Sequence, residues 1–122
     1  MEIWGSGKPR REFLYSEDMA EACIFIMENR EFQDTYANNE KEIRNTHINI
    51  GTGADISIKE LATKIKKIIG YQGKLYFNLS KADGTRVKLT DPSKLRELGW
   101  KYTVELEKGI ARVYTWYLRN SK

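Results

Sequence analysis

The chain of 122 residues has little of what several classes of protein depend on. It contains one cysteine and one histidine, so it can form no internal disulfide and offers no His/Cys ligand set for a zinc site. Its longest apolar run, from Ala22 to Met27, is far too short to span a bilayer. No segment at its start has the pattern of a secretory signal. We therefore expect a cytoplasmic protein with no metal site and no membrane partner.

Two signatures of nicotinamide enzymes are also missing. No G-x-x-G-x-x-G turn follows an N-terminal strand, and no tyrosine is followed four residues later by a lysine. Hydride transfer to a carbonyl needs a dinucleotide site and an acid that protonates the oxygen. We therefore expect that this chain alone binds no dinucleotide cofactor, contains no catalytic residue and is inactive.

The composition is that of one globular domain spanning residues 1–122. Hydrophobic residues make up 40% and charged residues 31%, which excludes a disordered or membrane-embedded chain. The net charge of +4 raises the question of nucleic-acid binding. The lysines between Lys59 and Lys67 alternate with other residue types and with Glu60, a pattern typical of a solvated helix face, so we consider a nucleic-acid partner unlikely. The polar, aperiodic segment 30–46 is predicted to be a surface insertion.

Apolar spacing and capping residues predict four helices. The first spans residues 16–29, with Ser16 as its cap. Its predicted buried stripe is Met19, Ala22, Cys23, Ile26 and Met27. Ser57 and Glu60 form a capping box for a second helix that ends at Gly70. A short helix is predicted between Asp91-Pro92 and Gly99, and a last one over residues 103–118.

Short alternating segments predict strands at residues 47–50, 74–77 and 88–90. The first of these ends at Gly51-Thr52-Gly53, which precedes a helix as a phosphate loop does. The segment lacks the Gly-Lys-Ser/Thr ending and a third glycine, so we interpret it as a turn near a substrate cleft.

The segment from Trp4 to Leu14 has the composition of an anion-binding turn. Gly5 and Gly7 allow the backbone to approach a ligand closely, and three cations follow them at Lys8, Arg10 and Arg11. A guanidinium can bind phosphate oxygens in a bidentate manner, and the indole of Trp4 offers a stacking surface. A hairpin turn with solvated basic residues explains these residues equally well.

Five motifs together resemble the C-terminal part of the GDP-L-fucose synthases. This family consists of epimerase-reductases of the extended short-chain dehydrogenase/reductase class. In order, they are WGSGKPRREFLYSEDMA, HINIGTG at 47–53, SKADGT at 80–85, Lys88-Leu89 and KLRELGW at 94–100. The resemblance implies an α/β protein: a mixed α+β substrate-binding lobe that lacks most of the Rossmann domain. It implies a GDP-sugar as ligand, and NADP as cofactor of the full-length enzymes, which convert GDP-4-keto-6-deoxy-D-mannose to GDP-L-fucose.

The resemblance also implies four substrate-binding residues: Trp4, Arg11, Asp83 and Lys88. In this assignment Arg11 and Lys88 neutralise a diphosphate, Asp83 accepts hydrogen bonds from sugar or ribose hydroxyls, and Trp4 covers part of the ligand. The chain departs from the family's Pro-Asp-Gly-Thr-Pro-Arg-Lys by reading Ala-Asp-Gly-Thr-Arg-Val-Lys over residues 82–88. The arginine is thus displaced by one position, which puts the role of Lys88 in question more than that of Arg11. Without the resemblance, Asp83-Gly84 is equally well explained as a plain turn.

Two other functions stay open from the sequence. The chain could be the lobe of another nucleotide-sugar epimerase or dehydratase, or a freestanding interaction module without catalysis. The family's larger sheet is missing here, so the predicted strand 47–50 would have an unpaired edge. We therefore expect the chain to self-associate through a contact that buries Ile48 or Ile50.

Overall fold

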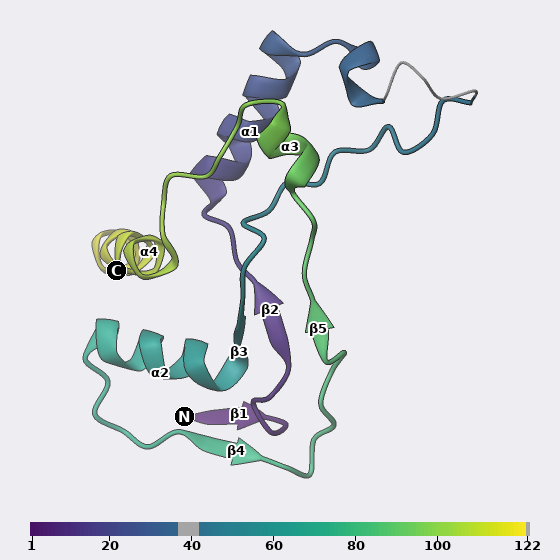
Figure 1. Ribbon diagram of the computed structural model, residues 1–122. Helices are drawn as coiled ribbons and strands as arrows, with labels where there is room; N and C mark the ends of the chain where they lie inside the picture. Colours follow the sequence, from purple (N-terminus) through teal and green to yellow (C-terminus); the bar gives the residue numbers. More distant parts are fainter. Residues whose placement is uncertain (37–41, 122) are drawn as a thin grey trace.

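The computed structural model describes residues 1–36 and 42–121, and it contains helices and strands in a mixed order (Figure 1). Residues 37–41 of the predicted insertion lie outside this range. The elements are β1 (Glu2–Trp4), β2 (Arg10–Glu12), α1 (Ser16–Asn29), the 3-10 helix η1 (Phe32–Thr35), β3 (Asp55–Ser57), α2 (Ile58–Ile69), β4 (Tyr76–Asn78), β5 (Val87–Lys88), α3 (Ser93–Glu97) and α4 (Leu106–Asn120). The predicted α/β class is confirmed, and none of the described helices is long and apolar enough to cross a bilayer.

Two small sheets hold the chain together. In one, β1 and β4 pair in parallel. In the other, β2 lies between β3 and β5, antiparallel to the first and parallel to the second. The side chains of successive residues in a strand point to opposite faces of the sheet, so successive side chains of the central strand β2 contact different parts of the molecule.

Helices α1 and α2 are present with the predicted limits, whereas the helix predicted over residues 103–118 is observed as α4 at Leu106–Asn120. In α2, the Ser57 hydroxyl accepts a hydrogen bond from the Glu60 backbone N–H at 3.2 Å, and the Glu60 carboxylate accepts one from the Ser57 N–H at 3.0 Å. Gly70 ends this helix in the left-handed conformation. The start of α1 differs in one detail: Tyr15 takes the cap position and Ser16 is the first helical residue, so the prediction of a Ser16 cap is wrong.

The strand predictions were less accurate, and the strand predicted at 47–50 does not form. No described strand lies beside this segment, and a strand needs a partner for its backbone groups. Side chains fix it instead: Asn49 Nδ2 donates to the Asp91 carbonyl at 3.1 Å, and Lys94 Nζ donates to the His47 carbonyl at 3.1 Å. Ile48 and Ile50 pack against the core as partly buried residues and no strand forms at this segment, so the predicted self-association stays a prediction. Strands β4 and β5 lie one or two residues away from their predicted positions.

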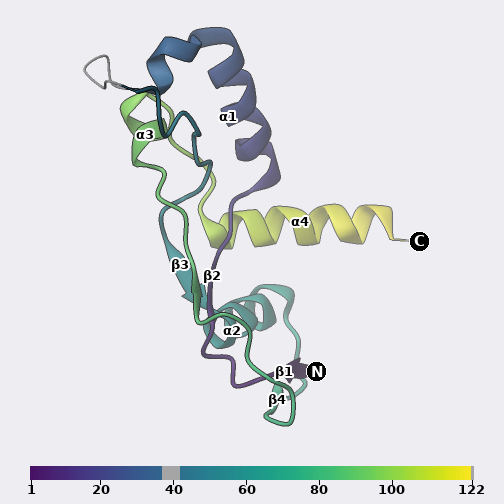
Figure 2. The same ribbon diagram turned by 90° about the vertical axis from the view of Figure 1, so that its right-hand side faces the viewer.

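The apolar core is small and lies between α1, α3 and the segment after α3. Its buried members are Ala22, Leu95 and Trp100, with Leu14, Phe25, Ile26, Ile48, Ile50 and Tyr102 packed around them. The predicted buried stripe of α1 is only partly correct. Cys23 is exposed, and Met19 and Met27 are 46% and 80% exposed, because α1 has apolar residues on two sides and the core covers only the side of Ala22 and Ile26. Helix α4 packs beside α2, and its C-terminal end projects away from the rest of the molecule (Figure 2).

A buried carboxylate connects α1 to the segment before α4. Asp18 is 2% exposed and accepts hydrogen bonds from the Thr103 hydroxyl at 2.9 Å and from the Val104 backbone N–H at 2.9 Å. Burial raises the pKa of the Asp18 carboxyl, but the hydrogen bonds from Val104 and Thr103, together with the charge of Arg112, outweigh it and hold the pKa below its usual value.

We expect Asp18→Asn to lower the free energy of unfolding by about 1.5–3 kcal/mol at pH 7, because an amide presents an N–H₂ group to donors that need an acceptor. The pKa of Asp18 is lower in the folded than in the unfolded chain. Its contribution is therefore present above the unfolded value of about 3.9 and is lost as the pH falls through the folded value. Urea unfolding from pH 7 to pH 2.5 should show the difference from wild type narrowing below about pH 4. The exposed Glu21→Gln on the same helix is the control, and an equal loss in both variants would refute this account.

Candidate functional site

The four predicted substrate-binding residues lie along one edge of the molecule. Trp4 ends β1, Arg11 is the middle residue of β2, Asp83 lies in the loop between β4 and β5, and Lys88 ends β5. Arg11 and Lys88 are direct neighbours in the pairing of β2 with β5. The structure thus brings together residues that are up to 84 positions apart in the sequence.

Asp83 fixes the glycine-rich turn that follows Trp4. Its carboxylate accepts hydrogen bonds from the Ser6 backbone N–H at 2.7 Å and from the Ser6 hydroxyl at 2.6 Å. These bonds, with a smaller effect of the Lys8 charge, lower the pKa of the Asp83 carboxyl below its usual value. Gly5 has a φ of +80°, and a Cβ there would collide with the Asp83 carboxylate. The turn and the Asp83 loop therefore form one unit, and each carboxylate oxygen keeps a lone pair for a ligand.

Arg11 is held against the same loop by backbone carbonyls. Its Nη1 donates to the carbonyl oxygens of Arg10 and Thr85, both at 2.7 Å. A Cβ at Gly84 would lie 3.0 Å from Nη2 of the same guanidinium, so the loop passes close to it. Within the described residues, the Nη2 and Nε groups of Arg11 donate to no acceptor. The guanidinium is thus positioned while part of its donor capacity is left for a ligand.

Trp4 presents an open aromatic face at this edge. The side chain is 71% exposed, and the Lys81 ammonium lies 5.2 Å from its ring centroid. Such a cation over an indole is attracted by the negative face of the ring. Lys88 is exposed beside Arg11, as expected for a cation that meets an anionic ligand.

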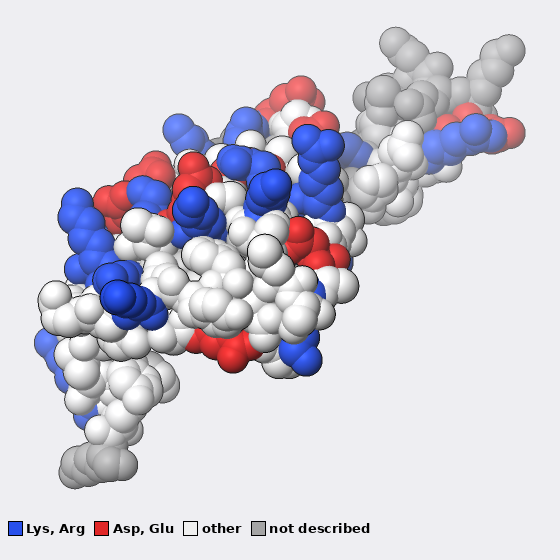
Figure 3. Space-filling model, turned by 90° about the horizontal axis from the view of Figure 1, so that it is seen from below, with Lys and Arg blue, Asp and Glu red and all other residues white. Residues whose placement is uncertain are grey.

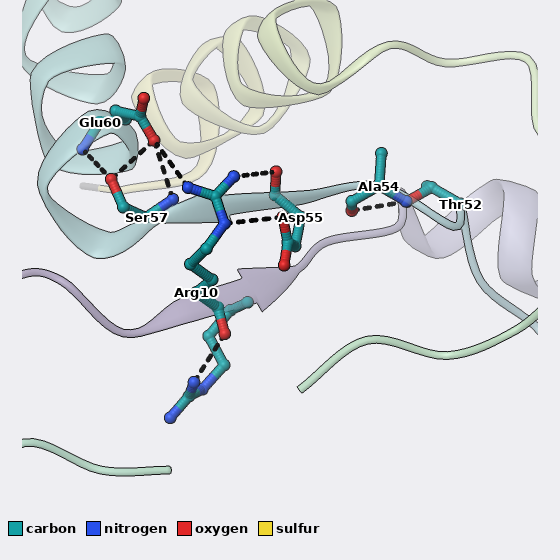
Figure 4. Close-up of polar contacts among 7 residues, drawn as sticks. Arg10, Thr52, Ala54, Asp55, Ser57 and Glu60 are labelled. Atoms are coloured by element: carbon teal, nitrogen blue, oxygen red, sulfur yellow. Dashed lines mark hydrogen bonds and ion pairs between the residues drawn. The ribbon is translucent and has the colours of Figure 1, made fainter. Parts of the chain in front are cut away.

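Arg10, next to Arg11 in sequence, has a structural role (Figure 4). Its Nε lies 2.8 Å from Asp55 Oδ1, and its Nη2 donates to the Asp55 carbonyl at 3.1 Å. Nη1 is 3.7 Å from the Glu60 carboxylate, the same group that caps α2. Because strand side chains alternate, Arg10 faces β3 and α2 while Arg11 faces the 83–86 loop. The neighbouring arginine therefore stabilises the scaffold that carries the site.

Sequence reasoning missed Glu12, which joins three segments behind the site. Its carboxylate accepts hydrogen bonds from the Thr90 N–H at 3.0 Å, the Thr90 hydroxyl at 2.5 Å and the Gly53 N–H at 2.6 Å. The Thr52 hydroxyl adds a fourth at 3.2 Å. Burial raises the pKa of the Glu12 carboxyl, but these hydrogen bonds outweigh it and lower the pKa below its usual value. The signal available in the sequence was a carboxylate directly after the two arginines in a short strand.

The Gly51-Thr52-Gly53 turn is built around this carboxylate. A Cβ at Gly51 would collide with the Thr90 hydroxyl and the Glu12 carboxylate, so a side chain there would disturb the hydrogen bond between these two groups. The space in which a phosphate loop would hold its anion already contains a negative charge. The interpretation of this segment as a turn and not a phosphate loop agrees with this geometry. Among the described residues, no cluster of three or more His, Cys, Asp or Glu side chains could hold a metal ion.

Comparison with known proteins relates the chain to one group of nucleotide-sugar enzymes. The sequence model of the NAD dependent epimerase/dehydratase family matches residues 1–51. GDP-L-fucose synthase of Escherichia coli (strain K12) is 46% identical over 118 residues, which is 97% of this chain and 36% of that protein. The chain thus spans about a third of the length of the curated relatives it matches.

Solved structures give the same relation. A GDP-6-OMe-4-keto-L-xylo-heptose reductase from C. jejuni superposes with a TM-score of 0.89 at 49% identity, over 97% of this chain and 33% of that one. A GDP-mannoheptose C4 reductase from Campylobacter jejuni with NADP bound superposes with a TM-score of 0.81 at 49% identity, over 96% of this chain and 34% of that one. The fold predicted from the resemblance, a partial extended short-chain dehydrogenase/reductase fold, is confirmed.

We expect Gly5→Ala to destabilise the chain more than Gly70→Ala. Both glycines have positive φ, so each alanine introduces left-handed strain of about 1–2 kcal/mol. At Gly70 nothing lies within 4 Å of the new Cβ, whereas at Gly5 the Asp83 carboxylate must also move and its bonds to Ser6 are lost. Urea unfolding compares the two losses, and the Ser6 amide signal in NMR should shift only in Gly5→Ala. Equal destabilisation with an unmoved Ser6 amide would contradict the described turn.

Proposed function

We propose that this relative of the GDP-L-fucose synthases is the substrate-binding portion of such an enzyme, which epimerises and reduces GDP-4-keto-6-deoxy-D-mannose to GDP-L-fucose with NADPH. The observation that carries the proposal is the convergence of Trp4, Arg11, Asp83 and Lys88 on one edge. These residues come from four separate segments: Lys81 and Thr85 contact Trp4 and Arg11, and Ser6 holds Asp83.

The geometry suggests a division of roles among the four residues. The unpaired N–H groups of Arg11, with Lys88 beside it, would bind the diphosphate. The indole of Trp4, with Lys81 over one part of it, would cover an uncharged part of the ligand. Asp83 would accept hydrogen bonds from hydroxyl groups through the lone pairs that Ser6 does not use.

The turn of this chain that resembles a phosphate loop does not suit an NADP phosphate. The turn at 51–53 surrounds the Glu12 carboxylate, which would repel a dinucleotide phosphate. In our proposal the cofactor is held outside this chain, by a portion corresponding to the other two thirds of the relatives, and the chain alone is inactive. A cytoplasmic location is kept as part of the proposal.

Self-association also remains part of the proposal, with a different surface from the one expected from the sequence. The exposed apolar side of α1, formed by Met19, Cys23, Ile24 and Met27, is a better candidate contact than Ile48 and Ile50, which pack against the core.

If the chain is instead the lobe of another nucleotide-sugar epimerase or dehydratase, its ligand would bind the edge of Trp4, Arg11, Asp83 and Lys88 and would carry a different base. Nucleotide competition separates these two substrate classes.

We expect GDP-mannose to bind this chain weakly, with an affinity that falls as the salt concentration rises. Arg11→Ala should lose about 1.5–3 kcal/mol of binding free energy, the range for hydrogen bonds to a charged group. Isothermal titration calorimetry in 25 and 250 mM salt measures both effects. Arg119→Ala, which removes an arginine from the last turn of α4, is the matched control and should bind as wild type does.

UDP-glucose serves as the ligand control in the same titrations. Stronger binding of UDP-glucose than of GDP-mannose would favour another epimerase or dehydratase. Unchanged GDP-mannose binding in Arg11→Ala would show that the ligand is held elsewhere.

A further inference from the structure

A second group of cations surrounds an open cavity beside the proposed binding edge. The cavity has a volume of about 460 Å³ and lies between the glycine-rich turn and the loop after β4. Its lining residues are Lys8, Pro9, Arg10, Asp83, Gly84 and Arg86. Two contacts hold its walls together: the bonds from Ser6 to Asp83, and a backbone hydrogen bond of 2.8 Å from the Arg10 N–H to the Arg86 carbonyl.

The charges of the lining residues do not cancel one another. The Arg10 guanidinium is compensated by Asp55 and Glu60, which lie outside the cavity. The Asp83 carboxylate already accepts two hydrogen bonds from Ser6. Lys8 and Arg86 are exposed, and neither lies within 4 Å of a carboxylate of residues 1–36 or 42–121. Two cations thus face a cavity whose lining includes one carboxylate.

This face of the molecule is not uniformly basic. Viewed from the end that carries β1 and β4, lysine and arginine side chains are interspersed with acidic ones and with uncharged surface (Figure 3). A long polyanion needs a continuous basic track, whereas a small phosphate group needs only two or three converging cations. The pattern therefore favours a small anion over a nucleic acid.

Gly84 lies between the cavity and the side chain of Arg11. Gly84 lines the cavity and also passes 3.0 Å from Arg11 Nη2, measured from the position of an added Cβ. The next residue, Thr85, accepts the hydrogen bond from Arg11 Nη1. A diphosphate that binds Arg11 on one side of Gly84 would therefore lie near Lys8 and Arg86 on the other.

We propose that Lys8 and Arg86 form a second anion subsite, which takes a phosphate group of the ligand that Arg11 also binds. We take this ligand to be a nucleoside diphosphate sugar, and that part of the inference rests on the proposed function. Arg86 is the arginine that lies one position away from the family pattern quoted for residues 82–88, so the subsite is argued from this chain's own residues.

Pyrophosphate is the probe that tests the subsite independently of the sugar and the base. Titrated into ¹⁵N-labelled chain at low salt, it should shift the backbone amides of Lys8, Gly84 and Arg86. Lys8→Ala and Arg86→Ala should each weaken its binding on the order of 3- to 10-fold. Lys101→Ala and Arg119→Ala each remove one positive charge from another part of the surface. They should change the affinity for pyrophosphate less than 2-fold, because distant charges are screened. Equal effects of all four variants, or shifts confined to other amides, would overturn the proposal.

GDP-mannose distinguishes failure of the subsite from failure of the proposed function. If GDP-mannose binding depends on Arg11 but not on Lys8 or Arg86, the subsite is wrong and the proposed function stands. If pyrophosphate binds at Lys8 and Arg86 while GDP-mannose does not bind at all, the subsite stands and the proposed function is wrong. Binding of GDP-mannose that is weakened by all three variants supports both. Circular dichroism of each variant verifies that it is folded.

Discussion

The carboxylate of Glu12 is the point on which the arrangement of the site depends. Its hydrogen bonds join β2 to the 51–53 turn and to Thr90, so the strand between them has a fixed position. On that strand, Arg10 binds Asp55 and the start of α2, while Arg11 faces the 83–86 loop. Three consecutive residues thus connect the scaffold to the edge that we propose binds the ligand. The Glu12 carboxylate is half-buried, and its four hydrogen-bond donors come from Thr52, Gly53 and Thr90, so the three segments hold one another in place.

The size of the core explains why this edge needs such polar connections. The buried apolar cluster of Ala22, Leu95 and Trp100 lies at the opposite end from the β1–β4 sheet (Figure 1). Large apolar side chains such as Met27 and Trp116 remain exposed, in keeping with a chain that spans a third of its relatives' length. The edge that carries Trp4 and Asp83 is therefore held less by apolar burial than by hydrogen bonds across strands and loops.

The sequence predicted what local interactions determine. The capping box of Ser57 and Glu60 and the left-handed Gly70 define α2 within the helix itself, so its limits could be read directly. The resemblance to the family predicted which four residues would form the site, and their roles are still predictions. The three-residue strands depend on partners far along the chain, as in the pairing of Ile3 with Phe77, and no local pattern identifies them. Periodicity likewise predicted one buried stripe on α1 that included Met19, Cys23 and Met27, but it could not tell that the core covers only the side of Ala22 and Ile26.

The most direct test of this account is to map where a GDP-sugar binds the intact chain. We predict that GDP-mannose, titrated into ¹⁵N-labelled protein, shifts the amides of residues 5–11 and 81–88 most strongly. The main competing location is the apolar groove of about 540 Å³ between α2 and α4, which Ile65, Ile69 and Ile110 line. If the largest shifts fall on those isoleucines while the amides of Arg11 and Gly84 stay unchanged, the edge described above is not the binding site and the account is wrong.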